Sequence, residues 1–235
     1  GIEKAGGWTV IEPDEHGDWL GQRDKSFEAY PPLGAKRENA QFTIFENYSA
    51  GVKTNRDPWA YNSSSIQLAS NMAKMIDFYS DCLSEPTRSD INDEKKISWS
   101  WVLRERFSKG KAASFREQAI IKSLYRPFSP QKLYYDGFFN ENRYLMPKIF
   151  PAGNELNRSI YITGPSAPSF SALMVDVVPC LDVMSKGQCF PRFLYEEASA
   201  GNLFAGGSLG GTQSEAITDE GLALFQAAYP SEVIT

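Results

Sequence analysis

The sequence contains few of the residues from which most active sites are built. Its single histidine, His16, stands in the acidic run DEHGD and has no second histidine with which to share a metal ion or a catalytic proton. The cysteines Cys82, Cys180 and Cys189 form no CxxC pair and are odd in number, so neither a zinc site nor a closed set of disulfides is expected. We therefore predict no catalytic residues, no metal site and a reducing, cytoplasmic location.

Long apolar runs and nucleotide-binding loops are also missing. No run approaches the roughly 20 apolar residues of a membrane-spanning helix, and the first residues do not resemble a signal peptide. The phosphate-binding pattern GxxxxGK[ST] does not occur, which argues against an ATPase. Four glycines in residues 206–211 lack the strand and the acidic residue of a dinucleotide site. We expect no membrane partner and no cofactor in this chain, although paired carboxylates for glycoside hydrolysis stay open.

Positive charge is scarce overall but concentrated in one segment. The chain has a net charge of −5. Between Trp101 and Lys132, however, eight basic residues stand against two acidic ones, a local excess of six, whereas residues 193–235 contain six acids and no Lys or Arg. This distribution permits a basic face on an acidic protein, and a solvated helix surface is the equally weighted alternative.

Local patterns predict many short elements and one long helix. Ser63, Ser64 and Ser65 offer caps for a helix with an apolar stripe that includes Ile66, Met72, Ile76, Tyr79 and Leu83. A polar loop at 84–94, a helix at 99–109 that ends at Gly110, and a last helix capped by Thr218 or Asp219 and ended by Pro230 should follow. Strands or extended pieces are expected at 8–11, 41–46, 59–61, 123–135, 159–163 and 190–195.

These elements predict an α+β fold with a mixed, mostly antiparallel sheet and several flanking helices. Residues 170–178 fit a buried strand or a short helix, and residues 198–211 are a flexible loop by composition. We interpret residues 1–40 as a connector and residues 41–235 as the folded domain.

Two segments combine residue types that suit nucleic acid. GVKTNRD, residues 51–57, places Lys53, Asn55 and Arg56 in a turn, and arginine and asparagine can read guanine and adenine edges. SLYRPFSPQKLYYD, residues 123–136, places Arg126 and Lys132 among aromatic residues, an arrangement that can join phosphate contact to base stacking. In both cases the plainer alternative stays open, namely a loop held together by its own side chains and a core strand with basic ends.

Seven runs follow one another along the chain: FENYSAGVKTNRDPWAYN, MIDFYSD, ISWSW, SLYRPFSPQKLYYD, NRYLMPKIFP, KGQCFPRFLYE and ITDEGLALFQAAYP. In order and spacing they resemble the C-terminal specificity region of Type ISP restriction-modification enzymes. The resemblance covers about Asp18 to the end of the chain. In that family one polypeptide joins a nuclease, a helicase-like translocase, a coupler, an adenine methyltransferase and a target-recognition domain. This chain lacks the methyltransferase tetrapeptide (N/D)PP(Y/F) and helicase motifs, which fits the last position.

The resemblance implies a DNA target-recognition domain that positions an adenine for methylation and gates the translocase and nuclease. Its partners would be double-stranded DNA and the methyltransferase and helicase/nuclease domains of the same polypeptide, with S-adenosylmethionine, ATP and Mg²⁺ bound only in those domains. Family members usually continue past the position of Pro230, which leaves open that the recognition domain is incomplete here. Residue type and the resemblance give these candidate DNA contacts: Lys53, Asn55, Arg56, Arg126, Lys132, Arg143, Lys186, Gln188 and Arg192.

Two other functions remain possible from the sequence. The shared motifs could belong to a structural or coupling module, with base reading carried by other loops or by residues beyond Thr235. An unrelated enzyme or a carbohydrate-binding module could use the five tryptophans and eleven tyrosines, although these counts also suit an ordinary aromatic core.

Overall fold

The computed structural model divides the chain into two compact units, Gly1–Pro32 and Leu33–Thr235. It describes residues 7, 9–15, 17–20, 26, 29–35, 42–151, 156–165, 167–196 and 213–233. In the first unit the described residues include a turn in which the Gly17 amide donates to the Asp14 carbonyl at 2.9 Å. The strand predicted at 8–11 is wrong for its described residues 9–11, which are irregular. Val10 is 85% exposed there, which does not fit a half-buried strand.

The described residues of the second unit form three sheets. The central sheet has the order β2-β4-β3-β7 and the second sheet has the order β1-β8-β5-β6, while β9 and β10 form a separate pair. All pairings are antiparallel except that of β3 with β7. The strands are β1 (Ser49–Ala50), β2 (Tyr61–Asn62), β3 (Ile120–Arg126), β4 (Ser129–Tyr134), β5 (Ser159–Ile162), β6 (Ala172–Val175), β7 (Val178–Pro179), β8 (Gln188–Pro191), β9 (Phe193–Tyr195) and β10 (Gln213–Glu215).

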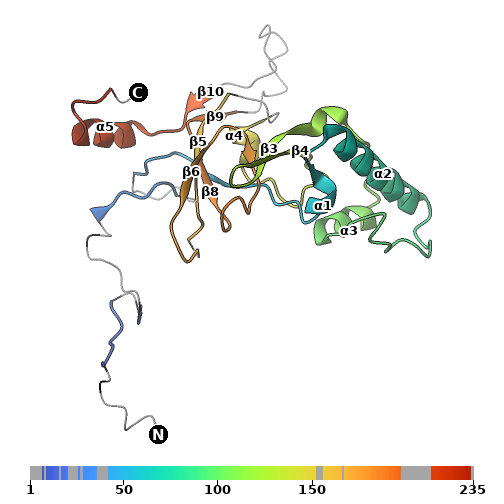
Figure 1. Ribbon diagram of the computed structural model, residues 1–235, viewed down its shortest axis with the longest axis horizontal. Coiled ribbons are helices and arrows are strands. Elements are labelled where there is room, and N and C mark those ends of the chain that lie inside the picture. Colours follow the sequence, from blue (N-terminus) through green and yellow to red (C-terminus); the bar gives the residue numbers. More distant parts are fainter. Residues whose placement is uncertain are drawn as a thin grey trace. The chain divides into compact units, whose positions relative to one another are not determined.

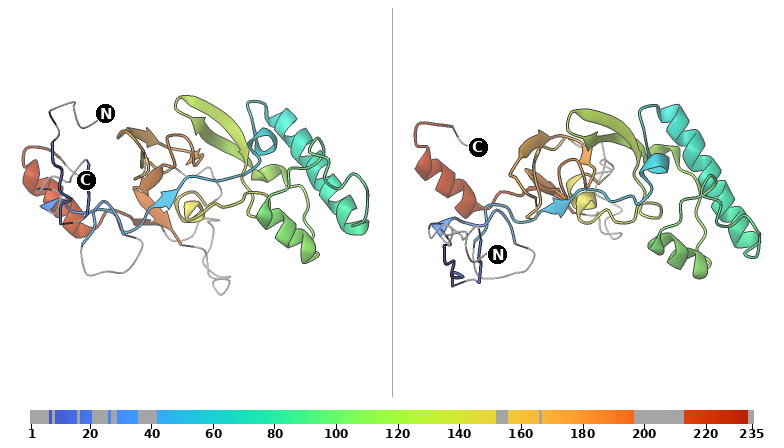
Figure 2. Two further views of the ribbon diagram at one scale, coloured as in Figure 1. Left: turned by 90° about the horizontal axis from the view of Figure 1, so that it is seen from below. Right: turned by 60° about the horizontal axis from the view of Figure 1, so that its bottom comes forward.

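Helices lie beside these sheets, which confirms the predicted α+β class. Within the second unit, Figures 1 and 2 show α2 and α3 on one side of the β3–β4 hairpin and the strands β5, β6 and β8 on the other. The helices are α1 (Asp57–Ala60), α2 (Ser65–Ser84), α3 (Trp101–Ser108), the 3-10 turn Glu117–Ala119, α4 (Met146–Ile149) and α5 (Asp219–Ala228).

The long helix α2 confirms its sequence signals. Ser64 caps it by accepting a hydrogen bond from the Gln67 amide at 3.3 Å. Met72, Ile76 and Tyr79 are buried as expected. Ile66, which the periodicity placed on the same stripe, is instead 82% exposed because the buried stripe begins only at Leu68, one turn into the helix.

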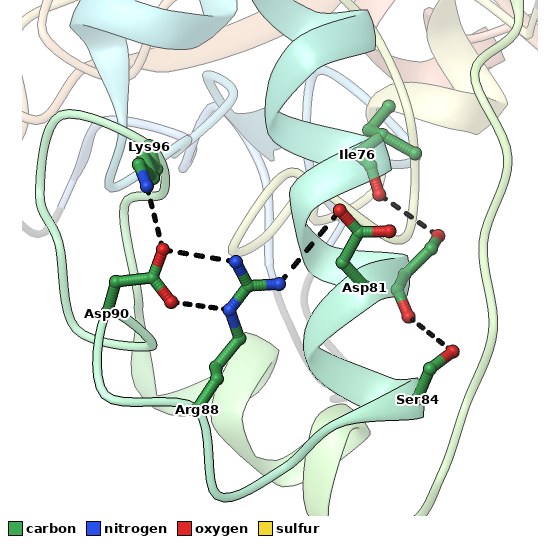
Figure 3. A network of polar contacts seen from close by, with 7 residues as sticks. Ile76, Asp81, Ser84, Arg88, Asp90 and Lys96 are labelled. Atoms are coloured by element: carbon green, nitrogen blue, oxygen red, sulfur yellow. Dashed lines mark hydrogen bonds and ion pairs between the residues drawn. The ribbon is translucent and has the colours of Figure 1, made fainter.

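The polar segment that follows α2 is held by an ion network. Arg88 Nη2 and Lys96 Nζ donate to Asp90 Oδ2 at 3.0 and 2.7 Å, and Arg88 also lies 3.9 Å from Asp81 on the helix (Figure 3). The guanidinium of Arg88 and the ammonium group of Lys96 lie 4.6 and 5.5 Å from the centre of the Phe78 ring. The loop is therefore tied back to α2 by charge and by cation–π contact.

Several predicted strands differ from those observed. The single strand expected at 123–135 is a hairpin, because Pro127 and Phe128 form the turn between β3 and β4. Residues 59–61 are not one extended piece, since Pro58 lies in the first turn of the short helix α1 and the chain becomes extended only at Tyr61. Of the strand expected at 41–46, whose first residue is not described, only Phe45 pairs, in an isolated bridge to Ile217.

The remaining predicted helices and strands agree more closely with the observed elements. The helix expected at 99–109 is α3, the strand at 159–163 is β5, and the last helix is α5 with Thr218 as its cap. Residues 170–178 form two strands rather than a helix, and 190–195 divides at Arg192 into β8 and β9. The loop expected at 198–211 lies outside the described residues.

The central sheet separates two hydrophobic cores. Leu133 and Tyr135 pack into the sheet core, whereas Tyr134 between them packs into the helical core, as the alternation of side chains along a strand requires. The sheet core joins strands of both four-stranded sheets and includes Tyr61, Ile121, Met146, Phe150, Tyr161, Val178 and Cys189. The helical core is formed mainly by α2 and the segments around α3 and includes Leu68, Met72, Tyr79, Cys82, Leu103 and Phe139.

Candidate nucleic-acid interface

Two lysines face each other across the β3–β4 hairpin. Lys122 on β3 is directly paired in register with Lys132 on β4. Side chains of such a pair emerge on the same face of the sheet, with Cβ atoms about 5 Å apart, and like charges in this position destabilise the sheet. Among the described residues neither lysine has an ion pair with an acid. The hairpin therefore carries a concentrated positive charge at this lysine pair, and no carboxylate of the described residues forms an ion pair with it.

The two lysines line a basic groove together with Arg116 and Arg143. This groove has a volume of about 830 Å³, and Asp176 is the one acidic residue among those that line it in the described part of the chain. Asp136 engages Arg116, whose Nη2 donates to the carboxylate at 2.5 Å. That pairing leaves Lys122, Lys132 and Arg143 as the cations of the groove that form no ion pair with a carboxylate among the described residues.

The Arg143 guanidinium contacts an aromatic ring and occupies space that a glycine leaves open. Its guanidinium carbon lies 5.0 Å from the centre of the Tyr135 ring, a cation–π contact. A side chain at Gly137 would place its Cβ 2.7 Å from Nη2 of Arg143, so the absence of a side chain makes room for the guanidinium. These contacts position the guanidinium at the groove.

A second groove runs along the outer part of the same hairpin. It has a volume of about 580 Å³ and shares Lys122 and Lys132 with the basic groove. Its other lining residues are largely apolar and include Phe128, Pro130, Leu173 and Met174. We call it the tip groove, because Phe128 belongs to the turn of the hairpin.

Arg126 is already engaged by its own domain. Its guanidinium carbon lies 3.9 Å from the centre of the Tyr125 ring, and Nη1 donates to the Tyr125 carbonyl at 2.7 Å. Nη2 lies 3.9 Å from an Asp57 carboxylate oxygen, and Nη1 is 3.4 Å from the Cys180 sulfur. Arg126 is half-buried, so any contact with a ligand would compete with or add to these interactions.

The turn at residues 53–57 presents one exposed polar side chain. Asn55 is exposed and has a φ of 53°, a left-handed conformation that asparagine tolerates better than most residues. Lys53 is half-buried, and its backbone pairs in both directions with Asn142, at 2.9 and 3.0 Å. Both side chains line a cleft of about 820 Å³ that also includes Asn92 and Arg104.

Arg56 in the same turn lies inside the domain. The residue is 2% exposed, and its guanidinium donates to the Phe139 carbonyl at 2.8 Å and to Ser100 Oγ at 2.7 Å. Burial lowers the pKa of Arg56 to about 10, and a nearby Glu141 opposes that shift, so the side chain is still charged at neutral pH. The sequence suggested Arg56 as a base contact. Because the guanidinium faces protein groups, we leave it out of the proposed contacts.

The remaining candidates lie on or next to the second sheet. Lys186 is exposed with a φ of 50° in the turn before β8, and Gln188 is half-buried on β8 between β1 and β5. Arg192 lies 3.7 Å from Glu215 and 4.9 Å from the centre of the Phe193 ring. The structure thus places the sequence candidates in three groups and joins only Lys132 and Arg143 in the basic groove.

Sequence reasoning missed Lys122 and Arg116 as members of this groove. Both were counted in the basic segment, but residue type alone could not single them out. The signal was the register of the hairpin: once the turn is placed at Pro127 and Phe128, Lys122 falls opposite Lys132. The turn was not recognised because residues 123–136 contain no glycine or asparagine to mark it, although Pro127 and Pro130 stand within the run.

The described residues contain no group of three or more His, Cys, Asp or Glu side chains placed to hold a metal ion. No helix in the described part of the chain is long and apolar enough to cross a membrane.

Comparisons with known proteins place this geometry in context. Residues 43–235 match the family model described as the Type ISP C-terminal specificity domain. None of the curated proteins matches the chain. Among solved structures, a DrdV–DNA complex is 31% identical with a TM-score of 0.80 over 100% of this chain.

Two further solved structures are similar over most of the chain. The ATP-dependent Type ISP restriction-modification enzyme LlaBIII bound to DNA is 31% identical with a TM-score of 0.80 over 91% of the chain. A nuclease-deletion mutant of the Type ISP enzyme LlaGI with a DNA substrate mimic is 28% identical with a TM-score of 0.76 over 96%. The matches cover 23% of the DrdV chain, 14% of LlaBIII and 18% of LlaGI.

Proposed function

Since the chain belongs to the family of Type ISP C-terminal specificity domains, we propose that it recognises a target sequence in double-stranded DNA for a restriction-modification enzyme. The observation that carries this proposal is the likeness over nearly the whole chain to structures described as DNA complexes. The uncompensated lysine pair of the central hairpin supports it independently, because phosphate neutralisation supplies much of the affinity of DNA-binding proteins.

The described geometry suggests that some residues contact phosphates and others contact bases. Lys122, Lys132 and Arg143 would neutralise phosphates along the basic groove. Asn55, with its exposed amide, is the best placed base-reading candidate of the 53–57 turn. Lys53, Arg126, Lys186, Gln188 and Arg192 stay in the proposal as additional contacts, each limited by the protein interactions described above.

The proposed module has no catalytic role of its own. It would act in the cytoplasm, position an adenine for a methyltransferase domain and gate a translocase and nuclease of the same polypeptide. Those domains would bind S-adenosylmethionine, ATP and Mg²⁺. Support comes from the family description, which names specificity rather than a reaction, and from the small share of the solved Type ISP chains that this domain covers.

The proposal is tested by titrating the chain against a pool of randomised duplexes at low and moderate salt and sequencing the retained DNA. We expect one enriched site whose affinity falls steeply with salt. No enrichment from a folded sample would overturn the proposal and favour a coupling module without base readout.

A variant pair then tests the basic groove. Replacing both lysines, Lys122→Ala with Lys132→Ala, should make the slope of log affinity against log salt less steep by roughly 2, since each phosphate contact contributes about 0.9. Lys74→Ala is the matched control, because Lys74 is exposed on α2 and lines neither groove. An unchanged slope in the double variant would exclude the groove as the phosphate site.

A further inference from the structure

The tip of the β3–β4 hairpin is a phenylalanine with almost no protein around it. Phe128 is 87% exposed, although the hairpin that carries it contributes Leu133 and Tyr134 to the two cores. The run SLYRPFSPQKLYYD is therefore not simply a core strand with basic ends. Its aromatic residue at the turn has no packing role in the described part of the domain, which calls for another explanation.

The backbone of the turn is unusual for a phenylalanine. Phe128 has a φ of 58°, in the left-handed region where glycine or asparagine is normally found. Pro127 before it and Pro130 after it restrict the chain on both sides of the ring. Neither the backbone of the turn nor burial accounts for a phenylalanine here. A contact of its ring with a molecule outside the domain would account for it.

Positive charge lines the same groove as this ring. The tip groove joins Phe128 to Lys122 and Lys132, and Arg126 lies two residues before Phe128. Asp176 is the one acidic residue among those described that line this groove. An exposed aromatic ring in front of a pair of lysines matches a polyanion that also offers flat apolar surfaces, which is the chemistry of stacked bases between phosphates.

We propose that Phe128 is an apolar wedge that inserts between adjacent base pairs of the bound duplex and kinks it. This proposal rests on the proposed function, because it assumes that the chain binds DNA. Insertion would replace the lost base–base stacking with stacking on the phenyl ring. The cost of unstacking depends on the base step, so the wedge would add sequence preference without a hydrogen bond to a base.

The dimensions of the hairpin suit this arrangement. Lys132 follows Phe128 by four positions, which at about 3.3 Å per residue corresponds to roughly 13 Å. The major groove of B-DNA is about 8.5 Å deep and admits a two-stranded β-ribbon. With the ring at the base pairs, the lysine pair would therefore remain outside the groove, at the level of the phosphates.

Phe128→Ala and Phe128→Gly test the wedge directly in the intact chain. Glycine relieves the left-handed strain at this position, so the glycine variant should fold even if alanine disturbs the turn. Phe170→Ala is the matched control, because Phe170 is 75% exposed and does not line the tip groove. Circular dichroism and thermal unfolding establish that each variant is folded.

The readouts are affinity for the duplex enriched from the random pool and the bend of that duplex, measured by energy transfer between dyes at its ends. Both Phe128 variants should bind about tenfold more weakly and leave the DNA straighter, while Phe170→Ala changes neither. A single mismatch, moved along the site, should strengthen binding by the wild-type chain at one step and not by Phe128→Gly.

The outcomes distinguish the proposed wedge from the proposed DNA recognition on which it rests. If the wild-type chain binds and both Phe128 variants match it in affinity and bend, the wedge is excluded while DNA recognition stands, and the ring would then belong to a contact with another protein domain. A wild-type chain that binds no duplex would overturn both proposals.

Discussion

The donors of a buried guanidinium need partners, and Arg56 has two neutral acceptors for its Nη atoms, while its Nε is buried without a hydrogen-bond partner among the described residues. The Phe139 carbonyl and Ser100 Oγ belong to segments far from the 53–57 turn in the sequence. Ser100 also caps α3 by accepting from the Leu103 amide. Arg56 therefore joins the turn to the start of a helix, which is a structural role for a residue whose type suggested base reading.

At this scale we predict that Arg56→Met lowers the free energy of unfolding by about 1–3 kcal/mol, because a buried carbonyl and hydroxyl lose their donor. Urea denaturation followed by tryptophan fluorescence measures the change. Asn55→Gly is the control, since glycine suits the left-handed φ of that exposed position and should change stability by less than about 0.5 kcal/mol. If Arg56→Met kept full stability and lost DNA affinity, Arg56 would be a DNA contact after all.

Among the elements, the loop after α2 depends on one carboxylate. Hydrogen bonds from Arg88 and Lys96 hold the pKa of Asp90 well below its usual range. A lowered pKa in the folded state stabilises the fold at pH values above the ordinary pKa of an aspartate, and this contribution is lost as the pH falls towards the lowered value. Asp90 thus fixes both cations over the Phe78 ring at neutral pH.

We therefore expect Asp90→Asn to lower the urea midpoint at pH 7 and to have a progressively smaller effect as the pH falls below about 4, where the carboxylate of the unfolded wild-type chain begins to take up its proton. Unfolding curves at pH 7, 5 and 3 measure this. Asp77→Asn on the exposed side of α2 is the control for loss of one negative charge. An Asp90→Asn effect independent of pH would show that the ion network contributes nothing.

The β3–β4 hairpin gives a prediction with two opposite effects. Lys122→Glu replaces repulsion by attraction across the pair with Lys132, so the free domain should gain up to about 1 kcal/mol of stability. The same change should weaken duplex binding, because the groove loses two units of charge. Lys74→Glu alters the net charge equally and should affect neither property as strongly. If Lys122→Glu raised or lowered both stability and DNA affinity together, the lysine pair would not be a repulsive phosphate-binding site.

The elements also show which signals the sequence carried. The α2 prediction was right because a serine cap and a 3.6-residue period agree over twenty residues. The hairpin turn was missed because its left-handed residue is a phenylalanine, where glycine or asparagine would have marked it. The lysine pair follows from that turn, so an unmarked turn concealed the main part of the candidate site. The strand at 41–46 failed because half-buried alternation does not guarantee a partner strand.

For the whole molecule, the order of the seven sequence runs indicated the family and function better than any single residue did. The resemblance to Type ISP specificity regions is confirmed by the family model over residues 43–235. The connector at 1–40, the residue-level contacts and the cofactors assigned to other domains stay predictions. Local sequence could not place the three groups of candidates relative to one another, because their separation depends on pairing between distant strands such as β1 with β8.

The two cores share the central sheet, so we expect them to unfold together. Cys82 lies in the helical core and Cys189 in the sheet core, and both are fully buried. Pulse labelling with iodoacetamide along a urea series, read by mass spectrometry, should give the two thiols the same midpoint. Cys180, also in the sheet core, is the internal reference. Labelling of Cys82 at lower urea would show that the helical core opens alone.

The shared strand also limits how such a domain can be exchanged between enzymes. Adjacent residues of β4, Leu133 and Tyr134, belong to different cores, so a chimera joined within the hairpin would combine mismatched halves in both. A transplant that carries over the specificity of this chain should therefore move the full matched region, residues 43–235. Smaller grafts would be confined to exposed positions such as Asn55 and Lys186, which can vary without altering either core.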